Sequence, residues 1–202
     1  MIFFDKSVDI SKPFSFIHFS RHFEEIMDKT YNNDYTDTII FCIGTDRSTG
    51  DCLGPLVGHK LKDMKIDNVH VFGSLDEPVH AKNLKIYLNK LVGFENPYVI
   101  AIDACLGKTE RIGYINIKEG PLSPGAGVNK NLPSVGNISI TGIVNVSGFM
   151  EVMVLQNTRL SLVMNMANII SGGIRYNLRK AYEARQTLLS NAISTTPNFE
   201  SY

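Results

Sequence analysis

Two hydrophobic patterns alternate along the chain, one typical of buried strands and the other of amphipathic helices. Apolar runs rich in β-branched residues stand at 38–44 and from 97 to about 103, as expected of strands buried on both faces, and the stretch 68–74 predicts another strand. Between them, segments 52–64 and 81–93 place apolar residues three and four positions apart, which predicts helices. Strands and helices in this order form a parallel sheet with helices on both faces. We therefore predict an α/β fold.

The remaining segments add a helix at each end and two further strands. Apolar spacing predicts a helix within 13–31, and alternation at 113–120 predicts a half-buried strand. Segment 137–146 predicts another strand, and the pattern from about 148 onward is helical. It leads into a long final helix over 158–193, and the glycine pair at 172–173 is expected to kink that helix.

No repeat, linker or low-complexity block divides the chain. We predict a single domain over 1–202, with 1–37 forming an N-terminal strand and helix extension and 191–202 a flexible tail. The Gly- and Pro-rich loop 121–136 is long for a compact domain, and such loops usually carry function. We expect it to act as a lid or substrate contact.

Composition narrows the functional classes. The 20 basic residues balance the 20 acidic ones, so nothing indicates a basic surface for nucleic acid. The three cysteines contain no C-x-x-C pair, which argues against a disulfide framework or zinc knuckle and fits a reducing compartment. Neither a signal peptide nor a membrane span is recognisable. We expect a cytoplasmic protein without a membrane or nucleic-acid partner, and leave self-association open.

Two aspartates occupy positions where parallel sheets form sites. Asp51 lies in the loop after strand 38–44, and Asp103 stands at the expected end of the strand that starts at 97. If the strand at 68–74 flanks the first strand on one side and the strand from 97 flanks it on the other, the winding direction reverses between the first and third strands. Asp51 and Asp103 would then face each other across one crevice.

A carboxylate pair in a crevice suits hydrolysis. One member can serve as acid and the other as base, as the addition of water to an amide requires. With a histidine, the same pair could hold a metal ion, and His80, after the second strand on the same edge of the sheet, is the candidate ligand. Asp46, in the same loop as Asp51, could tune the pair or help to bind substrate.

Structural roles also account for each residue taken alone. Asp51 precedes a helix and could be its N-cap, Asp103 stands where turns begin, and His80 could be an ordinary hydrogen-bonded histidine. Asp46 could be a loop residue and nothing more. The coincidence of two aspartates at one predicted crevice favours function for that pair.

Other catalytic classes find less support. Cys52 stands at a predicted helix N-terminus, where a thiolate is favoured, but His59 lies about two turns further along the helix, too far to act as its base. No G-x-S-x-G elbow is present. The loop stretch PGAGVNK lacks the spacing of a phosphate-binding loop.

Several motifs together identify a family resemblance. They are IGTDRSTGDCLGPLVG, PVHAKNL, VIAIDACLG, PGAGVNKNLPSVGNISITGIVN and GFMEVMVLQNTRLSLVMNMA. On these stretches, which cover most of residues 38–174, the chain resembles the YyaC family of sporulation proteins from spore-forming Firmicutes. The resemblance implies a role in sporulation and a location in the forespore cytoplasm.

That family in turn resembles the spore germination protease, an unusual aspartic endopeptidase that degrades small acid-soluble spore proteins. Its first catalytic aspartate falls on Asp51 of the stretch GDCLGP, and its second on Asp103 of the stretch IDAC. Its Pro-Gly-Ser-Gly-Val segment corresponds to PGAGV, which implies that Gly125 and Gly127 contact substrate. Lys130 in the same loop could pair with an acidic group of the substrate or with the aspartates, or be an ordinary surface lysine.

A further relative is the hydrogenase maturation endopeptidase, whose fold is an α/β sandwich with a twisted sheet. The resemblance implies a three-layer α/β/α sandwich here, with a mostly parallel sheet. That enzyme recognises nickel through two acidic residues and a histidine. The acidic positions fall on Asp51 and Asp103, but segment 140–148 contains no histidine. The absence favours a metal-free site without a cofactor, with a metal on Asp51, Asp103 and His80 as the alternative.

The resemblance to the germination protease has departures. Thr45 stands where that protease has Asn, and Gly50 where it has Pro. The chain is also much shorter. The leading hypothesis is a peptidase acting on a protein or peptide substrate, such as a spore protein. The alternatives are an inactive binding or scaffold protein that keeps the fold, and a metal-dependent hydrolase.

Overall fold

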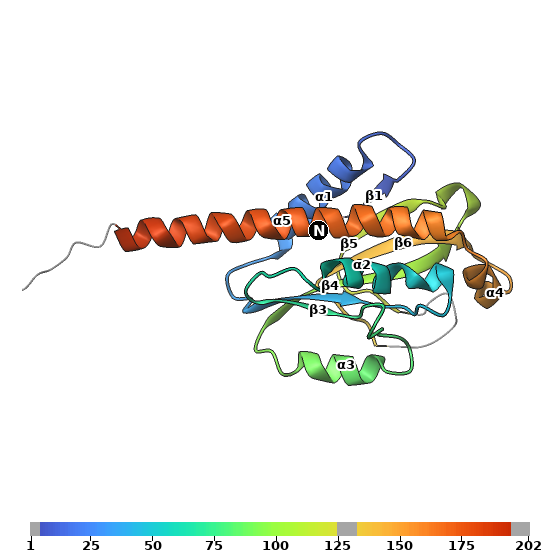
Figure 1. The fold of residues 1–202 in the computed structure, drawn as a ribbon, viewed down its shortest axis with the longest axis horizontal. Coiled ribbons are helices and arrows are strands. Elements are labelled where there is room, and N and C mark those ends of the chain that lie inside the picture. The colour runs from blue at the N-terminus through green and yellow to red at the C-terminus, as the bar shows by residue number, and fades with distance from the viewer. Residues whose placement is uncertain (1–4, 125–132, 195–202) are drawn as a thin grey trace, which may run out of the picture.

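The computed structural model describes residues 5–124 and 133–194. Within them, six strands form one sheet in the order β1-β5-β6-β4-β2-β3 (Figure 1). Strands β2, β3, β4 and β6 run parallel, whereas β5 and β1 complete one side in antiparallel pairing. The strand bounds are β1 Asp5–Asp9, β2 Asp37–Cys42, β3 Val69–Phe72, β4 Pro97–Gly107, β5 Tyr114–Glu119 and β6 Ile138–Val146.

Helices cover both faces of this sheet. The α-helices are α1 Ser15–Thr30, α2 Leu53–Leu61, α3 Leu84–Leu91, α4 Glu151–Gln156 and α5 Leu160–Ser194, with 3₁₀ turns η1 Thr49–Cys52 and η2 Thr109–Arg111. Figure 1 shows α1, α2 and α5 above the sheet and α3 below it. The predicted three-layer α/β/α architecture with a mostly parallel sheet is confirmed.

Two hydrophobic clusters, one on each face, join the layers. The larger lies between the sheet and helices α1, α2 and α5, with Phe19, Leu53 and Met166 fully or almost fully buried. The smaller lies between α3 and the other face of the sheet, where Leu84 and Tyr87 pack against residues of β2 and β4. Because residues 39–42 of β2 and 98–102 of β4 are buried, these parts of the two strands are continuously apolar. No helix in the described ranges is long and apolar enough to cross a membrane.

The glycine pair of α5 does not kink the helix, contrary to the sequence-based expectation. Helix α5 continues unbroken through both residues and runs straight in Figure 1. A Cβ at Gly173 would stand 2.4 Å from the ring of Phe19, and one at Gly172 would stand 3.0 Å from the ring of Phe16. The two glycines therefore let α1 approach α5 closely.

Candidate functional site

The sheet order places a switch point between β2 and β4. Strand β3 pairs with one side of β2 and β4 with the other, both in parallel. The winding direction reverses at β2, and the carboxyl ends of β2 and β4 open onto the crevice where such folds form sites. The predicted switch point is therefore confirmed.

Glycines shape the loop that follows β2. Gly44 has a φ of 140°, which disfavours any side chain. The loop then closes on itself, because the Thr45 N–H donates to the Asp51 carbonyl at 3.0 Å and the Asp51 N–H donates to the Ser48 carbonyl at 3.0 Å. Gly54 packs directly on the backbone of Ile43, where a Cβ would lie 2.0 Å from the carbonyl oxygen. These contacts hold the start of α2 against the end of β2.

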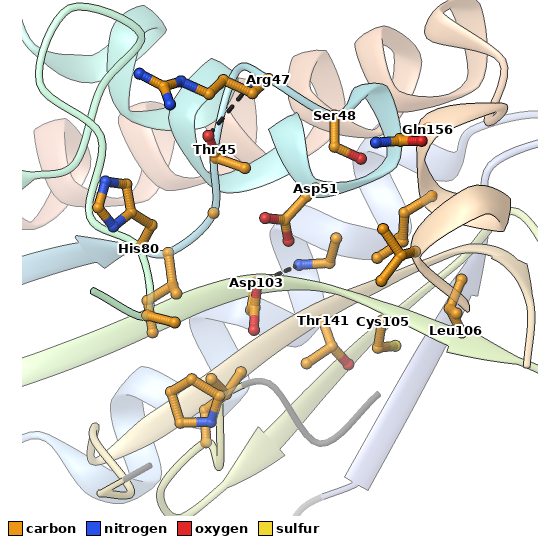
Figure 2. A pocket seen from close by; sticks show the side chains of 18 of the residues that line it. Thr45, Arg47, Ser48, Asp51, His80, Asp103, Cys105, Leu106, Thr141 and Gln156 are labelled. Carbon is orange, nitrogen blue, oxygen red and sulfur yellow. Dashed lines mark hydrogen bonds between the residues drawn. The ribbon is translucent and has the colours of Figure 1, made fainter. Parts of the chain in front are cut away.

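Asp51 lies in the 3₁₀ turn η1 rather than at the helix cap. Helix α2 begins at Leu53 and its N-cap position is Cys52, which makes no side-chain capping bond. The N-cap interpretation of Asp51 is therefore wrong for α2. The half-buried carboxyl group of Asp51 instead points into the crevice toward Asp103 (Figure 2).

Asp103 lies inside β4, not at its end. The strand continues to Gly107, and Asp103 pairs with Thr141 of β6. The predicted strand end and the turn interpretation are both wrong. The side chain is only 8% exposed, and its Oδ1 accepts a hydrogen bond of 2.8 Å from the Ala104 N–H, which orients the carboxyl group (Figure 2).

Both aspartates line one pocket of about 390 Å³, within the size range usual for ligand sites. Its walls come from the β2–η1 loop, β4, β6, the segment after β3, the segment after β5, and α4. Lining residues include Thr45, Arg47, Ser48, Asp51, His80, Lys82, Asp103, Cys105, Ser123, Thr141, Val152, Leu155 and Gln156.

His80 also lines the pocket, but the structure does not group it with the aspartates as a metal site. Its backbone N–H donates to Asn83 Oδ1 at 2.8 Å, and Figure 2 shows its ring to one side of the two carboxyl groups. Among the side chains that the structure describes, no three His, Cys, Asp or Glu are placed to share a metal ion.

The remaining residues predicted from the sequence do not line the pocket or lie outside the described residues. Asp46 is exposed and is not among the pocket-lining residues, so its part in substrate binding stays a prediction. Gly125, Gly127 and Lys130 lie outside the described residues. Ser123, which precedes them, lines the pocket.

Three features of the pocket were not predicted from the sequence. Arg47 and Lys82 line it as exposed cations, and α4 supplies a wall through Val152, Leu155 and Gln156. Arg47 is in the same loop as Asp51, and this proximity in the sequence could have identified it as a pocket residue. The helical pattern from about 148 onward predicts helix over α4, but no local signal places that helix against the pocket.

The nearby thiols are poor nucleophiles. Burial raises the pKa of Cys52 above its usual value, and the carboxylates of Asp46 and Asp51 raise it further. Burial likewise raises the pKa of Cys105 to about 11. Both thiols are therefore protonated near neutral pH, which argues against the thiolate that a helix N-terminus would favour at Cys52.

Comparisons with known proteins agree with this architecture. Residues 16–173 match the model of a family described as "Protein of unknown function (DUF1256)". The chain is 57% identical over 153 residues to the "Uncharacterized protein YyaC" of Bacillus subtilis strain 168, a match that covers 75% of this chain and 74% of that protein. The chain therefore belongs to the DUF1256 family, and the resemblance seen in its sequence is confirmed.

A solved structure shares the fold at low identity. It is the [NiFe] hydrogenase maturation protease HycI from Thermococcus kodakarensis KOD1, with a TM-score of 0.50 and 18% identity. The likeness covers 78% of this chain and 98% of the archaeal protein. At this identity the match shows the fold alone.

Proposed function

We propose that this member of the DUF1256 family is a peptidase that hydrolyses peptide bonds with Asp51 and Asp103. The observation that carries the proposal is their placement: one aspartate follows β2, the other lies in β4, and both line the same pocket at the switch point. Two separate segments of the chain thus each bring a carboxyl group into one pocket. A structural role for either aspartate alone would not require the other to be there.

The chemistry asks one carboxyl group to accept a proton and the other to donate one. A water molecule between them loses a proton to the carboxylate as it attacks the carbonyl carbon of the substrate. The carboxylic acid then supplies the proton that the departing amine requires. The Ala104 N–H bound to Asp103 Oδ1 holds that group in one orientation for the exchange.

The pair acts in this proposal without a resident metal or cofactor. Asp51 and Asp103 supply two carboxylates, but the described side chains add no third ligand beside them, whereas a catalytic metal usually takes three protein ligands. Substrate contacts come from Asp46 and, beyond the described residues, from Gly125, Gly127 and Lys130. The archaeal neighbour, named as a maturation protease, supports peptide-bond cleavage as an activity of this fold.

The biological setting follows from the sequence resemblance to sporulation proteins. We place the enzyme in the cytoplasm of the forespore, with a spore protein or another polypeptide as substrate. Nucleic acid and membranes are not among its proposed partners.

A cleavage survey tests the proposal. Purified protein is incubated with an extract of Bacillus subtilis spore proteins, and new peptide termini are identified by mass spectrometry. The Asp51→Asn variant serves as the control for contaminating proteases. Termini that appear with the wild type and not with Asp51→Asn support a peptidase. Their absence over a range of pH and added divalent ions would instead support a binding or scaffold role.

A further inference from the structure

An exposed apolar surface lies beside the pocket, on α4 and the residues before it. We call it the α4 patch and define it as Phe149, Met150, Val152 and Met153. Phe149 is 79% exposed and Val152 61% exposed, and the other two are at least half exposed. Large contiguous apolar patches on the surface of a soluble protein usually mark an interaction site.

The α4 patch is continuous with the pocket. Val152 belongs to both, because it lines the pocket together with Leu155 and Gln156. Figure 1 shows α4 at the end of the sheet, and Figure 2 shows Gln156 next to Ser48, on the side away from His80. A molecule that occupies the pocket therefore has apolar surface within reach on this side.

Helix α4 is fixed relative to Asp51. A Cβ at Gly50, the residue before Asp51, would stand 2.8 Å from the Leu155 side chain and 2.9 Å from the Leu155 Cα. The side-chain amide of Asn145 donates to the Val154 carbonyl and to Thr158 Oγ1, both at 3.2 Å. The patch is thus held at a constant position beside the carboxyl pair.

The two sides of the pocket differ in charge. Segment 146–156 carries one charged residue, Glu151, whereas the β2–η1 loop and the segment after β3 present Arg47 and Lys82. Neither cation forms an ion pair within the described residues. An extended chain across the pocket would therefore meet cations on one side and apolar surface on the other.

We propose that the α4 patch binds a large apolar side chain of an extended polypeptide, next to the peptide bond held at Asp51 and Asp103. This inference rests on the proposed function and names its substrate class: polypeptides with Leu, Ile, Phe or Met beside the cleaved bond. A methionine-rich patch adapts to side chains of different shape. A polypeptide is favoured over a second copy of this chain because Val152 lies on the pocket wall itself, where the bound substrate must pass.

A binding experiment tests the patch separately from catalysis. The Asp51→Asn protein is immobilised and mixed with short synthetic peptides of random sequence, and the retained peptides are sequenced by mass spectrometry. The test protein is the double variant Asp51→Asn/Val152→Asp. The control is Asp51→Asn/Ile86→Asp, because Ile86 on α3 is 60% exposed and lies outside the pocket. Circular dichroism and thermal unfolding confirm that all three fold alike.

We expect Asp51→Asn and the Ile86 control to enrich large apolar residues at one peptide position by roughly ten-fold, and the Val152 variant to lose that enrichment. Equal enrichment in all three proteins, or no enrichment in any, would overturn the inference. A second copy on the patch would instead appear as a dimer that Val152→Asp dissociates, with peptide selection unchanged, and this result would also overturn it.

The same proteins separate the two proposals. If peptide selection depends on Val152 but the wild type cleaves nothing, the proposal for the α4 patch is supported and the peptidase proposal is rejected. If the wild type cleaves peptides but selection does not depend on Val152, the peptidase proposal is supported and the proposal for the α4 patch is rejected.

Discussion

The backbone of Gly44 lies directly against the carbonyl group of Asp51. A Cβ added at Gly44 would stand 2.1 Å from the Asp51 oxygen and 2.9 Å from Cδ of Pro55. The same oxygen accepts the hydrogen bond from the Thr45 N–H. The close approach of these two residues therefore sets the position of Asp51 at the mouth of the pocket.

Replacing Gly44 by alanine should displace Asp51 as well as destabilise the fold. A side chain at a φ of 140° costs roughly 1–3 kcal/mol, and the backbone contact adds overpacking of roughly 1–3 kcal/mol. Gly113→Ala is the matched control, because Gly113 also has positive φ but its added Cβ would meet only ordinary contacts, at 3.7 Å and beyond. Urea unfolding should show a larger loss for Gly44→Ala. Equal losses would show that the Asp51 contact is unimportant.

The two glycines of α5 should respond differently to alanine. Gly173→Ala places its Cβ 2.4 Å from the fully buried ring of Phe19, so the free energy of unfolding should fall by roughly 1–3 kcal/mol. Gly172→Ala meets Phe16, which is 42% exposed and can move aside. There the gain in helix propensity, up to about 1 kcal/mol, should offset much of the cost. Thermal unfolding of the two variants measures the difference, and a more harmful Gly172→Ala would contradict this account of the α1–α5 contact.

Stability should decline at alkaline pH partly through Tyr98. Burial raises the pKa of Tyr98 from 10.0 to about 12, so the folded state keeps its proton after the unfolded state has lost it. The stabilisation is fully present below pH 10 and is lost as pH rises from 10 toward 12, by at most about 1.4 kcal/mol per pH unit.

Tyr98→Phe removes this titration and should flatten the alkaline decline. Tyr87 and Cys105 also have raised pKa values, but they titrate in both proteins and cancel in the comparison. Thr30 keeps its hydrogen bond to the Ile26 carbonyl when the Tyr98 hydroxyl is removed. Urea unfolding of both proteins below pH 10 and between pH 10 and 12 provides the measurement. Parallel declines would rule out a contribution from Tyr98.

The sequence was sufficient to predict the parallel strands, whereas the switch point also required an assumed strand order, which the structure bears out. Once β2, β3 and β4 were recognised, the topology rule for parallel sheets brought Asp51 and Asp103 to one crevice. The local hydrophobic pattern was less informative about where strands and helices end. The residues after Asp103, Ala-Cys-Leu-Gly, suit a strand or a turn equally well, and only the pairing with β6 extends β4 to Gly107.

Features that depend on distant partners could not be predicted from local sequence. The glycine pair at 172–173 suggested a kink because nothing nearby in the chain shows that Phe16 and Phe19 pack on it. The helical pattern from about 148 onward predicted helix over α4, but the place of that helix at the pocket could not be predicted, because it depends on contact with a distant segment. The contact between Gly50 and Leu155 that places this wall beside Asp51 joins residues more than a hundred positions apart.

The most direct test of the central claim compares three asparagine variants on one peptide found in the cleavage survey. Asp51→Asn and Asp103→Asn should each lower kcat/KM by at least about 100-fold, because each removes a group that exchanges a proton in the reaction. Asp63→Asn, at an exposed aspartate outside the pocket, is the matched control and should cleave like the wild type. Circular dichroism should show all three variants folded. Undiminished cleavage by folded Asp51→Asn or Asp103→Asn would contradict the paired-aspartate mechanism.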